Sequence, residues 1–357
     1  MSQDLHGRPH SGFGFGAGEG GGTFAGRVGV EIVGSGSYLP QRVLTNQDLE
    51  KVMDTSDEWI VQRTGIRERH ICDAANGEAT KRMGAHALRR ALADAKIGPD
   101  DLDLMICATM TGEMNCPATA NLIGHEVGVK RAGSFDLNAA CSGFVYSVNL
   151  AHDLIRGGAY RTVAVMGVDC LSTLMDYSTA GRGTAIIFGD AAGCAIFRAT
   201  PDTRKGILAQ AMHADGEGWK EIFVPRTMHD FPAGQACDPS KLGKVQMNGA
   251  AVFKFAVSTF SNLIEETLEK GNVKPEEVDM FICHQSNMRI LKSARERFGL
   301  SEDKLYINID RVGNTVGASV PLCLDELRKA GKVREGQKVM FLAFGGGLTW
   351  ASSLWQL

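Results

Sequence analysis

The sequence predicts a layered α/β protein in which two halves with the same order of elements pack against each other. Residues 99–110 (PDDLDLMICATM) and 275–286 (PEEVDMFICHQS) share a turn signal, an acidic pair and a short apolar run. A helix-period segment precedes each run, and helix, strand, small-residue turn, helix and apolar strand follow it in the same order. Duplicated α/β units pack as a pseudo-twofold pair, so we expect α/β/α/β/α layers with a site where the halves meet.

A Gly-rich tail, residues 1–28, precedes the first half. It lacks the charged and apolar regions of a secretory signal, and it has too few apolar side chains to offset the entropy of ordering, so we expect a flexible segment. Residues 29–200 are predicted as the first half and residues 247–357 as the second. The interrupted polar stretch of residues 201–246, rich in Gly and Pro, is predicted to link them.

The first half opens with a predicted strand within residues 26–40, which ends in a Gly/Ser/Pro turn. Its GSGSYL segment partly resembles a dinucleotide loop, but it lacks the third glycine and runs towards a proline rather than a helix, so it carries little weight. Residues 46–71 predict a helix with Asn46 as a candidate N-cap. A Gly/Ala-rich run, residues 184–197, predicts the last strand of this half.

The remaining elements follow from the duplication. Strands that alternate with helices favour sheets rich in parallel pairs, covered by helices. Helices are predicted at residues 84–96, 120–129, 138–158, 255–270, 289–300 and 313–331, and strands at 132–137, 161–168, 304–309 and 337–347.

Composition narrows the function classes. With 357 residues, 44% of them hydrophobic and 22% charged, the chain resembles an ordinary globular protein of about two domains. A net charge of −3 gives no general electrostatic reason to bind nucleic acid or membrane, and no apolar run approaches the roughly 18 residues of a membrane span. Nine scattered cysteines without zinc spacing predict a reduced, cytoplasmic protein with no structural metal. We expect no permanently bound cofactor.

Cys141 differs from the other cysteines because small residues flank it and a helical pattern begins directly after it. A thiol at a helix N-terminus faces unpaired N–H groups, which lower its pKa and make it a better nucleophile. The alternative is a small buried side chain that only packs.

His284 and Asn314 complete a candidate catalytic set. His284 follows the apolar run of the second half, so it projects from the carboxyl end of a strand, where α/β sites form. Asn314 lies in the turn that duplicates the turn of Cys141, so all three can converge where the halves meet. Each taken singly could be structural, as a core histidine or a helix cap. Together they suit acyl transfer, with a thiolate that attacks a thioester and two neutral donors that hold an oxyanion or enolate.

At this point the chain resembles β-ketoacyl-acyl-carrier-protein synthase III, the initiating condensing enzyme of type II fatty-acid synthesis in the thiolase superfamily. The resemblance covers about residue 29 to the C-terminus and rests on GSGSYLP, DTSDEWIVQRTGIRERH, AACSGF, RGTAIIFGDAAG, HQSNMRI, GNTVGASVP and FGGGLTW. It implies a thiolase-like fold and a homodimer with ping-pong kinetics. Cys141 would be acylated by acyl-CoA, and His284 and Asn314 would assist decarboxylation of malonyl-acyl carrier protein. The backbone N–H groups of Cys141 and Gly346 would form the oxyanion hole.

The turn around Asn314 separates this family from its relatives. Elongating condensing enzymes carry His at this position, and thiolases have a GHP-type turn and a second cysteine near the final glycine loop. This chain reads GNT, and its FGGGLTW segment has no cysteine. Condensation driven by loss of carbon dioxide therefore fits better than reversible thiolysis.

The resemblance also maps substrate contacts. Coenzyme A would meet Trp59 and Arg63, with Arg182 as a further adenine or phosphate contact and Gly249 in the tunnel wall. Aromatic and guanidinium groups suit stacking and phosphate binding, although Trp59 could instead pack on its helix. Two departures affect this assignment. Ala250 stands where the family often has Asn, and the MDYSTAG loop before Arg182 is about two residues longer than in common members.

The acyl pocket and the carrier-protein surface are further expectations. Phe344 is predicted to line the acyl pocket. Cys116 occupies a position where some relatives place a Phe that caps this pocket across the dimer, so the smaller thiol predicts primers longer or bulkier than acetyl. A basic cluster on helical segments near the tunnel mouth would dock an acidic acyl carrier protein, although helix surfaces carry such residues routinely; it comprises Lys254, Arg289, Arg295 and Arg297.

Two rival functions stay open. A relative recruited to secondary metabolism, of the polyketide or quinolone type, could use the same three residues with a different acceptor. A non-catalytic acyl-carrier-binding scaffold is the more distant alternative, which the complete set of Cys141, His284 and Asn314 and the retained glycine loop argue against.

Overall fold

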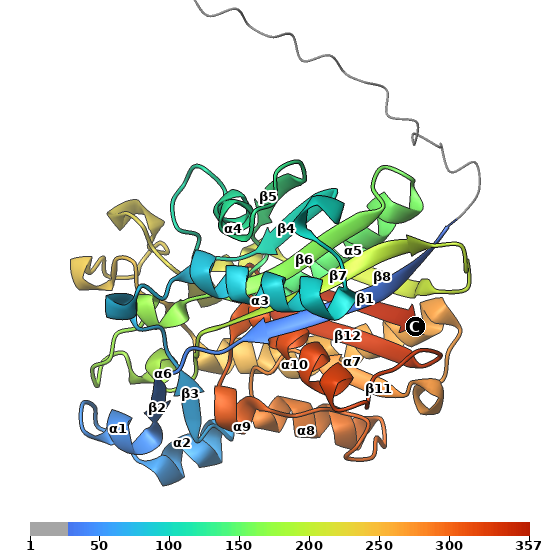
Figure 1. Ribbon diagram of the computed structural model, residues 1–357. Coiled ribbons are helices and arrows are strands. Elements are labelled where there is room, and N and C mark those ends of the chain that lie inside the picture. Colours follow the sequence, from blue (N-terminus) through green and yellow to red (C-terminus); the bar gives the residue numbers. More distant parts are fainter. Residues whose placement is uncertain (1–27) are drawn as a thin grey trace, which may run out of the picture.

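The computed structural model describes residues 28–357 (Figure 1), so the predicted tail lies almost wholly outside the described residues. The strands are β1 Gly29–Tyr38, β2 Val43–Thr45, β3 Glu68–His70, β4 Leu104–Ala108, β5 Gly133–Leu137, β6 Thr162–Asp169, β7 Ala191–Thr200, β8 Gly206–Ala214, β9 Ile222–Phe223, β10 Gln246–Met247, β11 Met280–Cys283, β12 Lys338–Gly345 and β13 Thr349–Gln356. The α-helices are α1 Asn46–Glu50, α2 Asp57–Thr64, α3 Thr80–Ala95, α4 Thr119–Val127, α5 Gly143–Arg156, α6 Arg182–Ala185, α7 Gly249–Gly271, α8 Met288–Arg297, α9 Ile309–Val312 and α10 Ser319–Lys329.

Two large sheets repeat one topology, which confirms the duplication. The first sheet has the order β5-β4-β6-β7-β1, and the second has the order β11-β12-β13-β8. The pairs β4/β6 and β11/β12 are parallel, whereas β6/β7, β7/β1, β12/β13 and β13/β8 are antiparallel. The prediction of parallel-rich sheets was therefore wrong, because the last and first strands of each half pair antiparallel with their neighbours. Both sheets are mixed.

Two segments differ from the predicted elements of the second half. Gly206–Ala214, within the predicted linker, forms β8, which occupies in the second sheet the place that β1 has in the first. Residues 304–309, predicted as a strand, contribute only a parallel bridge between Leu305 and Phe281. At the edge of β11 away from β12, the described residues therefore form this one bridge, whereas β4 pairs with the full strand β5 at the corresponding edge.

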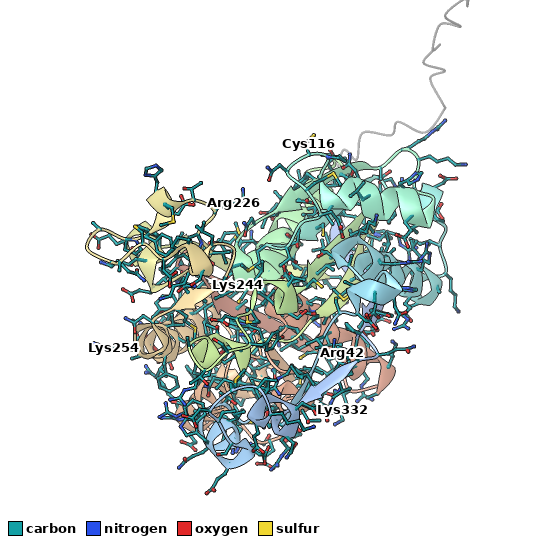
Figure 2. The ribbon with its side chains drawn as sticks, turned by 90° about the vertical axis from the view of Figure 1, so that its left-hand side faces the viewer. Arg42, Cys116, Arg226, Lys244, Lys254 and Lys332 are labelled. Atoms are coloured by element: carbon teal, nitrogen blue, oxygen red, sulfur yellow. The ribbon has the colours of Figure 1, made fainter. Side chains whose placement is uncertain are left out.

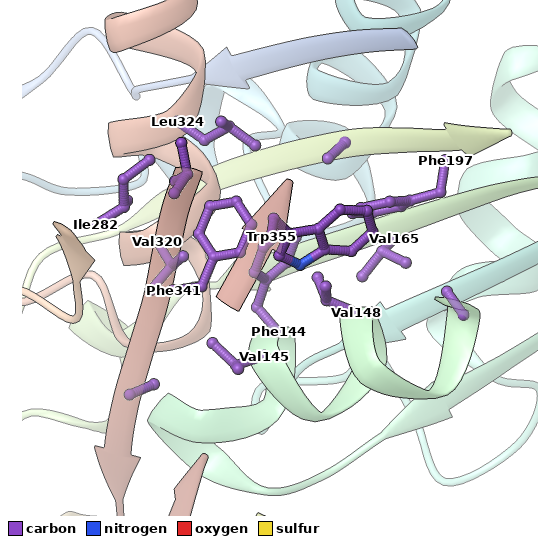
Figure 3. Packing of buried hydrophobic residues seen from close by; sticks show 14 of the residues in the cluster. Phe144, Val145, Val148, Val165, Phe197, Ile282, Val320, Leu324, Phe341 and Trp355 are labelled. Atoms are coloured by element: carbon purple, nitrogen blue, oxygen red, sulfur yellow. The ribbon is translucent and has the colours of Figure 1, made fainter. Parts of the chain in front are cut away.

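The layers follow from strands that bury both faces (Figure 1). Along β4, Leu104 and Ile106 face the central core, while Met105 and Cys107 face the outer core under α3 and α4. The second sheet is covered on its outer face by α7 and α8. Helices α5 and α10 lie between the two sheets, and Figure 3 shows their side chains packed around Trp355. The Trp355 ring lies 5.4 Å from that of Phe197 in the first sheet. The predicted α/β/α/β/α order is confirmed.

The GSGSY segment of β1 is a packing motif. A Cβ on Gly34 or Gly36 would lie 2.4 Å from a backbone oxygen of α3, so the helix can approach the strand only because both residues are glycine. On the other face, Ser35 and Ser37 donate hydrogen bonds to the buried carboxylate of Asp325 on α10. The alternation of Gly and Ser therefore positions one outer and one central helix.

Two further predictions about the first half were wrong in detail. Residues 46–71 form two short helices and a strand, and the first helix is capped by the Thr45 hydroxyl, which accepts from Asp48 N. Asn46 instead donates to Asp57 and to the Ile66 carbonyl, tying the two helices together. The strand predicted at residues 184–197 begins only at Ala191, because α6 and the turn after it occupy the preceding residues.

No helix among residues 28–357 combines the length and the apolar character that a membrane crossing requires.

Replacing Gly36 by Ala should destabilise the protein by about 1–3 kcal/mol, because the new Cβ would overlap the backbone of α3 and force the two elements apart. Urea unfolding would measure the loss. Gly216→Ala is the matched control, since nothing lies within 4 Å of its added Cβ. Equal stability of the two variants would contradict this account of the motif.

Candidate active site

A cavity of about 530 Å³ opens at the seam between the halves. Its lining brings together the candidate residues from both halves, as the duplication predicts. Apolar side chains make up much of the remaining wall. The lining residues that the sequence analysis named are Trp59, Arg63, Cys141, Gly249, Ala250, Arg289, His284, Asn314, Phe344 and Gly346.

Cys141 is the middle residue of a short 3-10 turn, Ala140–Ser142, directly before α5. Ala140 adopts a positive φ of 46°, which bends the chain sharply between β5 and the helix. Cys141 is 8% exposed and packs within an apolar cluster that includes Leu171, Ile186 and Val316. The turn therefore presents the sulfur at the cavity while excluding most water from it.

The predicted lowering of the Cys141 pKa is contradicted. Burial and, to a smaller extent, the nearby carboxylate of Asp169 together raise the pKa of the thiol to about 12, although a backbone hydrogen bond opposes them. The helix N-terminus lies where the sequence placed it, but the removal of the thiolate from water outweighs the backbone hydrogen bond that lowers the pKa. The resting side chain is a neutral thiol.

His284 follows β11, as predicted, and its backbone N–H donates to the Leu342 carbonyl at 2.8 Å. Its ring stands edge-on to Phe344 with centroids 5.6 Å apart. Burial lowers the pKa of His284 to about 3, so the imidazole is neutral near pH 7. Nδ1 is buried and without a hydrogen-bond partner among the described residues. A neutral imidazole carries one N–H and can act as a donor.

Asn314 is fixed by three hydrogen bonds. Its backbone N–H donates to the Ile187 carbonyl and its own carbonyl accepts from Gly189 N, both at 2.9 Å. Its side-chain oxygen accepts from Val316 N, also at 2.9 Å. Because the oxygen is engaged inside the turn, the amide nitrogen is the group that can donate into the cavity.

The glycine segment at the end of β12 lies directly against Cys141. A Cβ on Gly345 would lie 2.7 Å from the Cys141 backbone nitrogen, so only glycine permits this approach. Gly346 also lines the cavity. The structure thus brings the two residues predicted to form the oxyanion hole to one side of the site.

The predicted coenzyme A residues gather near the cavity. The Arg63 guanidinium lies over the Trp59 ring at 4.6 Å and that of Arg182 at 5.4 Å. Arg182 is not part of the lining, and it also pairs with Asp54 at 3.2 Å. Trp59 is therefore an aromatic surface flanked by two cations, the arrangement expected for an adenine or a phosphate.

The four cationic residues predicted to dock the carrier protein fall into two groups. Arg289 lines the cavity, and its guanidinium lies over the Phe253 ring at 4.9 Å. Lys254 projects from α7 (Figure 2). Arg295 and Arg297 instead pair with Glu302 and Glu265, each at 2.8 Å. Docking stays a prediction, with Lys254 and Arg289 as its best-placed members.

Cys116 is exposed and does not line the cavity of its own chain (Figure 2). Its predicted role concerns the pocket of a second copy and stays a prediction.

A group of side chains apart from the cavity has the composition of a metal site. Cys72, Cys170 and Asp190 place their ligand atoms within 4.8 Å of one another. Both Asp190 oxygens already accept backbone hydrogen bonds, from Ser172 N at 2.8 Å and Cys72 N at 2.7 Å. A hydrogen bond with Cys170 and burial raise the pKa of Cys72, which favours a protonated thiol. The Asp190 carboxylate therefore holds the backbone at Cys72 and at Ser172 in place.

Sequence reasoning missed two parts of the site. Ile222 and Met247 lie in or beside the predicted linker, yet they line the cavity. Asp169 is buried near Cys141. A carboxylate that ends the apolar run of residues 161–168 is the signal that could have identified it, because polar residues at strand ends often belong to sites.

Two mixed sheets of repeated topology around central helices, with Cys, His and Asn at their seam, define a thiolase-fold condensing enzyme. The sequence model of 3-oxoacyl-[acyl-carrier-protein] synthase III matches residues 135–216, and that of its C-terminal part matches residues 268–357. The β-ketoacyl-[acyl-carrier-protein] synthase III of Caldanaerobacter subterraneus is 43% identical over 328 residues, which cover 92% of this chain and 98% of the relative.

Solved structures agree with this assignment. The 3-oxoacyl-[acyl-carrier-protein] synthase III of Aquifex aeolicus superposes with a TM-score of 0.84 at 39% identity, over 92% of this chain and all of that one. The priming β-ketosynthase of the R1128 polyketide pathway has the same TM-score at 32% identity, over 92% and 97% of the two chains. The chain belongs to the β-ketoacyl-[acyl-carrier-protein] synthase III family, whose members are condensing acyltransferases of fatty-acid biosynthesis.

The depressed pKa of His284 should appear in the pH dependence of stability. An unfolded His binds a proton below about pH 6.5, whereas folded His284 does so only near pH 3, so acidification favours the unfolded state. Between pH 6.5 and 5, His284 should cost about 2 kcal/mol of unfolding free energy. Over the same pH interval, the unfolding free energy of His284→Asn, measured by urea titration, should fall by about 2 kcal/mol less than that of the wild-type protein. Identical pH slopes would contradict a neutral buried imidazole.

Proposed function

We propose that this protein initiates fatty-acid synthesis by condensing an acyl-CoA primer with malonyl-acyl carrier protein, through an acyl-Cys141 intermediate and by ping-pong kinetics. The observation that carries the proposal is the convergence of Cys141, His284 and Asn314 on one cavity at the seam of the halves. The names of the relatives, each a β-ketoacyl-[acyl-carrier-protein] synthase III, support it.

In the first step the sulfur of Cys141 attacks the thioester carbon of the primer. The carbon–sulfur bond to coenzyme A breaks, and the proton of the Cys141 thiol ends on the sulfur of coenzyme A. The exchange is neutral overall, so a thiol that is protonated at rest is compatible with it. Backbone N–H groups of Cys141 and Gly346 would stabilise the negative oxygen of the tetrahedral intermediate.

In the second step the malonyl group loses carbon dioxide, and the electron pair of the broken carbon–carbon bond passes to an enolate. Two neutral donors, the His284 imidazole and the Asn314 amide, would hold the enolate oxygen. The carbanion then attacks the acyl carbon, a carbon–carbon bond forms, and the carbon–sulfur bond to Cys141 breaks. The Cys141 sulfur leaves as a thiolate and takes up one proton from solvent, which restores the resting thiol. Decarboxylation needs no strong base, which suits a histidine with a pKa of about 3.

The residues that line the cavity support a thioester substrate that carries a polar coenzyme A group. Apolar side chains such as Ile186, Ile222 and Phe344 line it together with Cys141 and would enclose an acyl chain, whereas Trp59 and Arg63 would receive coenzyme A. The length and branching of the primer would follow from the apolar part.

A second candidate is priming in a secondary-metabolite pathway, favoured by the likeness to the R1128 priming β-ketosynthase at 32% identity. The same intermediate would form. Turnover of the acyl enzyme with malonyl-acyl carrier protein from fatty-acid synthesis, compared with a polyketide carrier protein, separates the two.

We also propose that the protein works as a homodimer. Within residues 28–357, strand β5 ends the first sheet and has no partner strand on its outer edge, and Phe135 on it is 36% exposed. Pairing of this edge with a second copy would cover both features.

Cys141→Ser should abolish the covalent acyl adduct that mass spectrometry detects after incubation with acyl-CoA. Cys237→Ser, at an exposed cysteine outside the cavity lining, should keep it. His284→Ala should still form the adduct but lose about 10²-fold or more in condensation, because its donor acts in the second step. Absence of an adduct in the wild-type protein with acetyl-, isobutyryl- and octanoyl-CoA would sink the proposal.

Trp59→Ala should raise the KM for acyl-CoA about tenfold or more, because stacking of a base on an aromatic ring contributes about 1–3 kcal/mol. Initial rates of CoA release would measure it. Trp219→Ala should leave KM unchanged, since Trp219 is exposed and outside the cavity lining. An unchanged KM in Trp59→Ala would place the adenine elsewhere.

A further inference from the structure

Asp169 is a buried carboxylate that the proposed chemistry does not use. It ends β6 and is 1% exposed. Its Oδ1 accepts hydrogen bonds from Met110 N at 2.8 Å and from the hydroxyls of Thr109 and Thr111, each at 3.2 Å. All three donors belong to the loop after β4, in the first half.

The other oxygen of Asp169 reaches the second half. Oδ2 accepts from Gly317 N at 3.2 Å, across the seam of the molecule. A Cβ on Gly317 would lie 3.2 Å from the same oxygen, so the carboxylate occupies the space that a side chain would need. Asp169 is thus a direct polar link between the two halves beside the active site.

Gly317 is the counterpart of Cys141. Each is the middle residue of a 3-10 turn, Ala140–Ser142 in one half and Val316–Ala318 in the other. Each follows a residue with positive φ, 46° at Ala140 and 51° at Val316. The carboxylate therefore binds the turn that duplicates the nucleophile turn.

The same turn orients Asn314. The Asn314 side-chain oxygen accepts from Val316 N, and the next backbone N–H, of Gly317, donates to Asp169. Two successive backbone donors thus connect the Asn314 amide to the Asp169 carboxylate. Displacement of the turn would rotate the amide that faces the cavity.

We propose that Asp169 is a positioning residue of the condensation. It holds the turn of Asn314 against the first half so that the amide points at the enolate, and its charge acts on the thiol of Cys141. The proposal rests on the proposed function, because it assigns Asn314 to the second step.

The electrostatic part follows from burial. Desolvation raises the pKa of Asp169 to about 7, although four hydrogen bonds oppose it. The titratable groups on which its charge acts are the thiols of Cys141 and of Cys107 on β4, and it raises the pKa of both. A charged Asp169 therefore adds to the effect of burial, which keeps the resting Cys141 protonated.

Asp169→Asn tests both parts. The amide is the same size, but its NH₂ must face either the Met110 or the Gly317 N–H group, where two donors oppose each other. We expect condensation to fall about tenfold or more while the acyl adduct on Cys141 still forms. The loss of charge should lower the pKa of Cys141, so alkylation of this residue by iodoacetamide at pH 8, followed by mass spectrometry, should accelerate about threefold or more.

Gly317→Ala separates positioning from charge. Its Cβ would press on the carboxylate and shift the turn while the charge stays, so condensation should fall and the alkylation rate should not rise. It also serves as the test if Asp169→Asn does not fold.

Asp325→Asn is the matched control. Asp325 is likewise 1% exposed, but it lies on α10, and its hydrogen bonds go to Ser35 and Ser37 of β1 and to Lys329 rather than to either catalytic turn. It should lose stability but keep the wild-type ratio of condensation to acylation and the wild-type alkylation rate.

Equal losses of acylation and condensation in Asp169→Asn, with unchanged alkylation, would reduce Asp169 to a purely structural residue. Absence of an acyl adduct in the wild-type protein would instead overturn the condensing function itself, so the two failures are distinguishable.

Discussion

The active site depends on the close approach of backbone to backbone where the two halves meet. A Cβ on Gly345 would lie 2.7 Å from the Cys141 nitrogen, and one on Gly167 would lie 2.0 Å from the Gly317 carbonyl oxygen. The two contacts are related by the duplication. Gly345 lies on β12 and Gly167 on β6, and each of these strands directly precedes the last strand of its half. In both contacts this strand lies against the 3-10 turn of the other half. Without a side chain at these two strand positions, the turns can reach the seam. This reciprocal fit brings Cys141 and Asn314 to one cavity.

Tight packing at the seam also sets the charge state of the site. Removal from water raises the pKa of Cys141 and of Asp169 and lowers that of His284. Each shift favours the neutral form. A site with a neutral imidazole and a neutral amide suits a reaction in which decarboxylation itself supplies the carbanion, and it is poorly suited to proton abstraction by a strong base. The same burial that stabilises the fold therefore restricts the chemistry.

The two ends of the cavity obey different constraints. Around Cys141, residues are fixed by strands, turns and backbone hydrogen bonds. Towards Trp59, the contacts come from α2 and from the α7 N-terminus, where Gly249 and Ala250 are exposed. Substrate preference within one family can vary at such exposed walls without a change in the buried reaction centre. The likeness to both fatty-acid and polyketide priming enzymes is consistent with this division.

The sequence by itself determined the duplication, the layer order and the three residues that meet at the seam. These features are local and repeated: the period of an apolar run, the small residues around Cys141, and His284 at a strand end. Only the tertiary structure decided that β8 belongs to the second sheet, that residues 304–309 form no full strand, and that the sheets are mixed, because strand pairing joins residues far apart in the chain. The tertiary structure also decided that the pKa of Cys141 is raised rather than lowered. The start of the helix after Cys141 is visible in the sequence. The burial that raises the pKa of Cys141 is not, because side chains from both halves contribute to it.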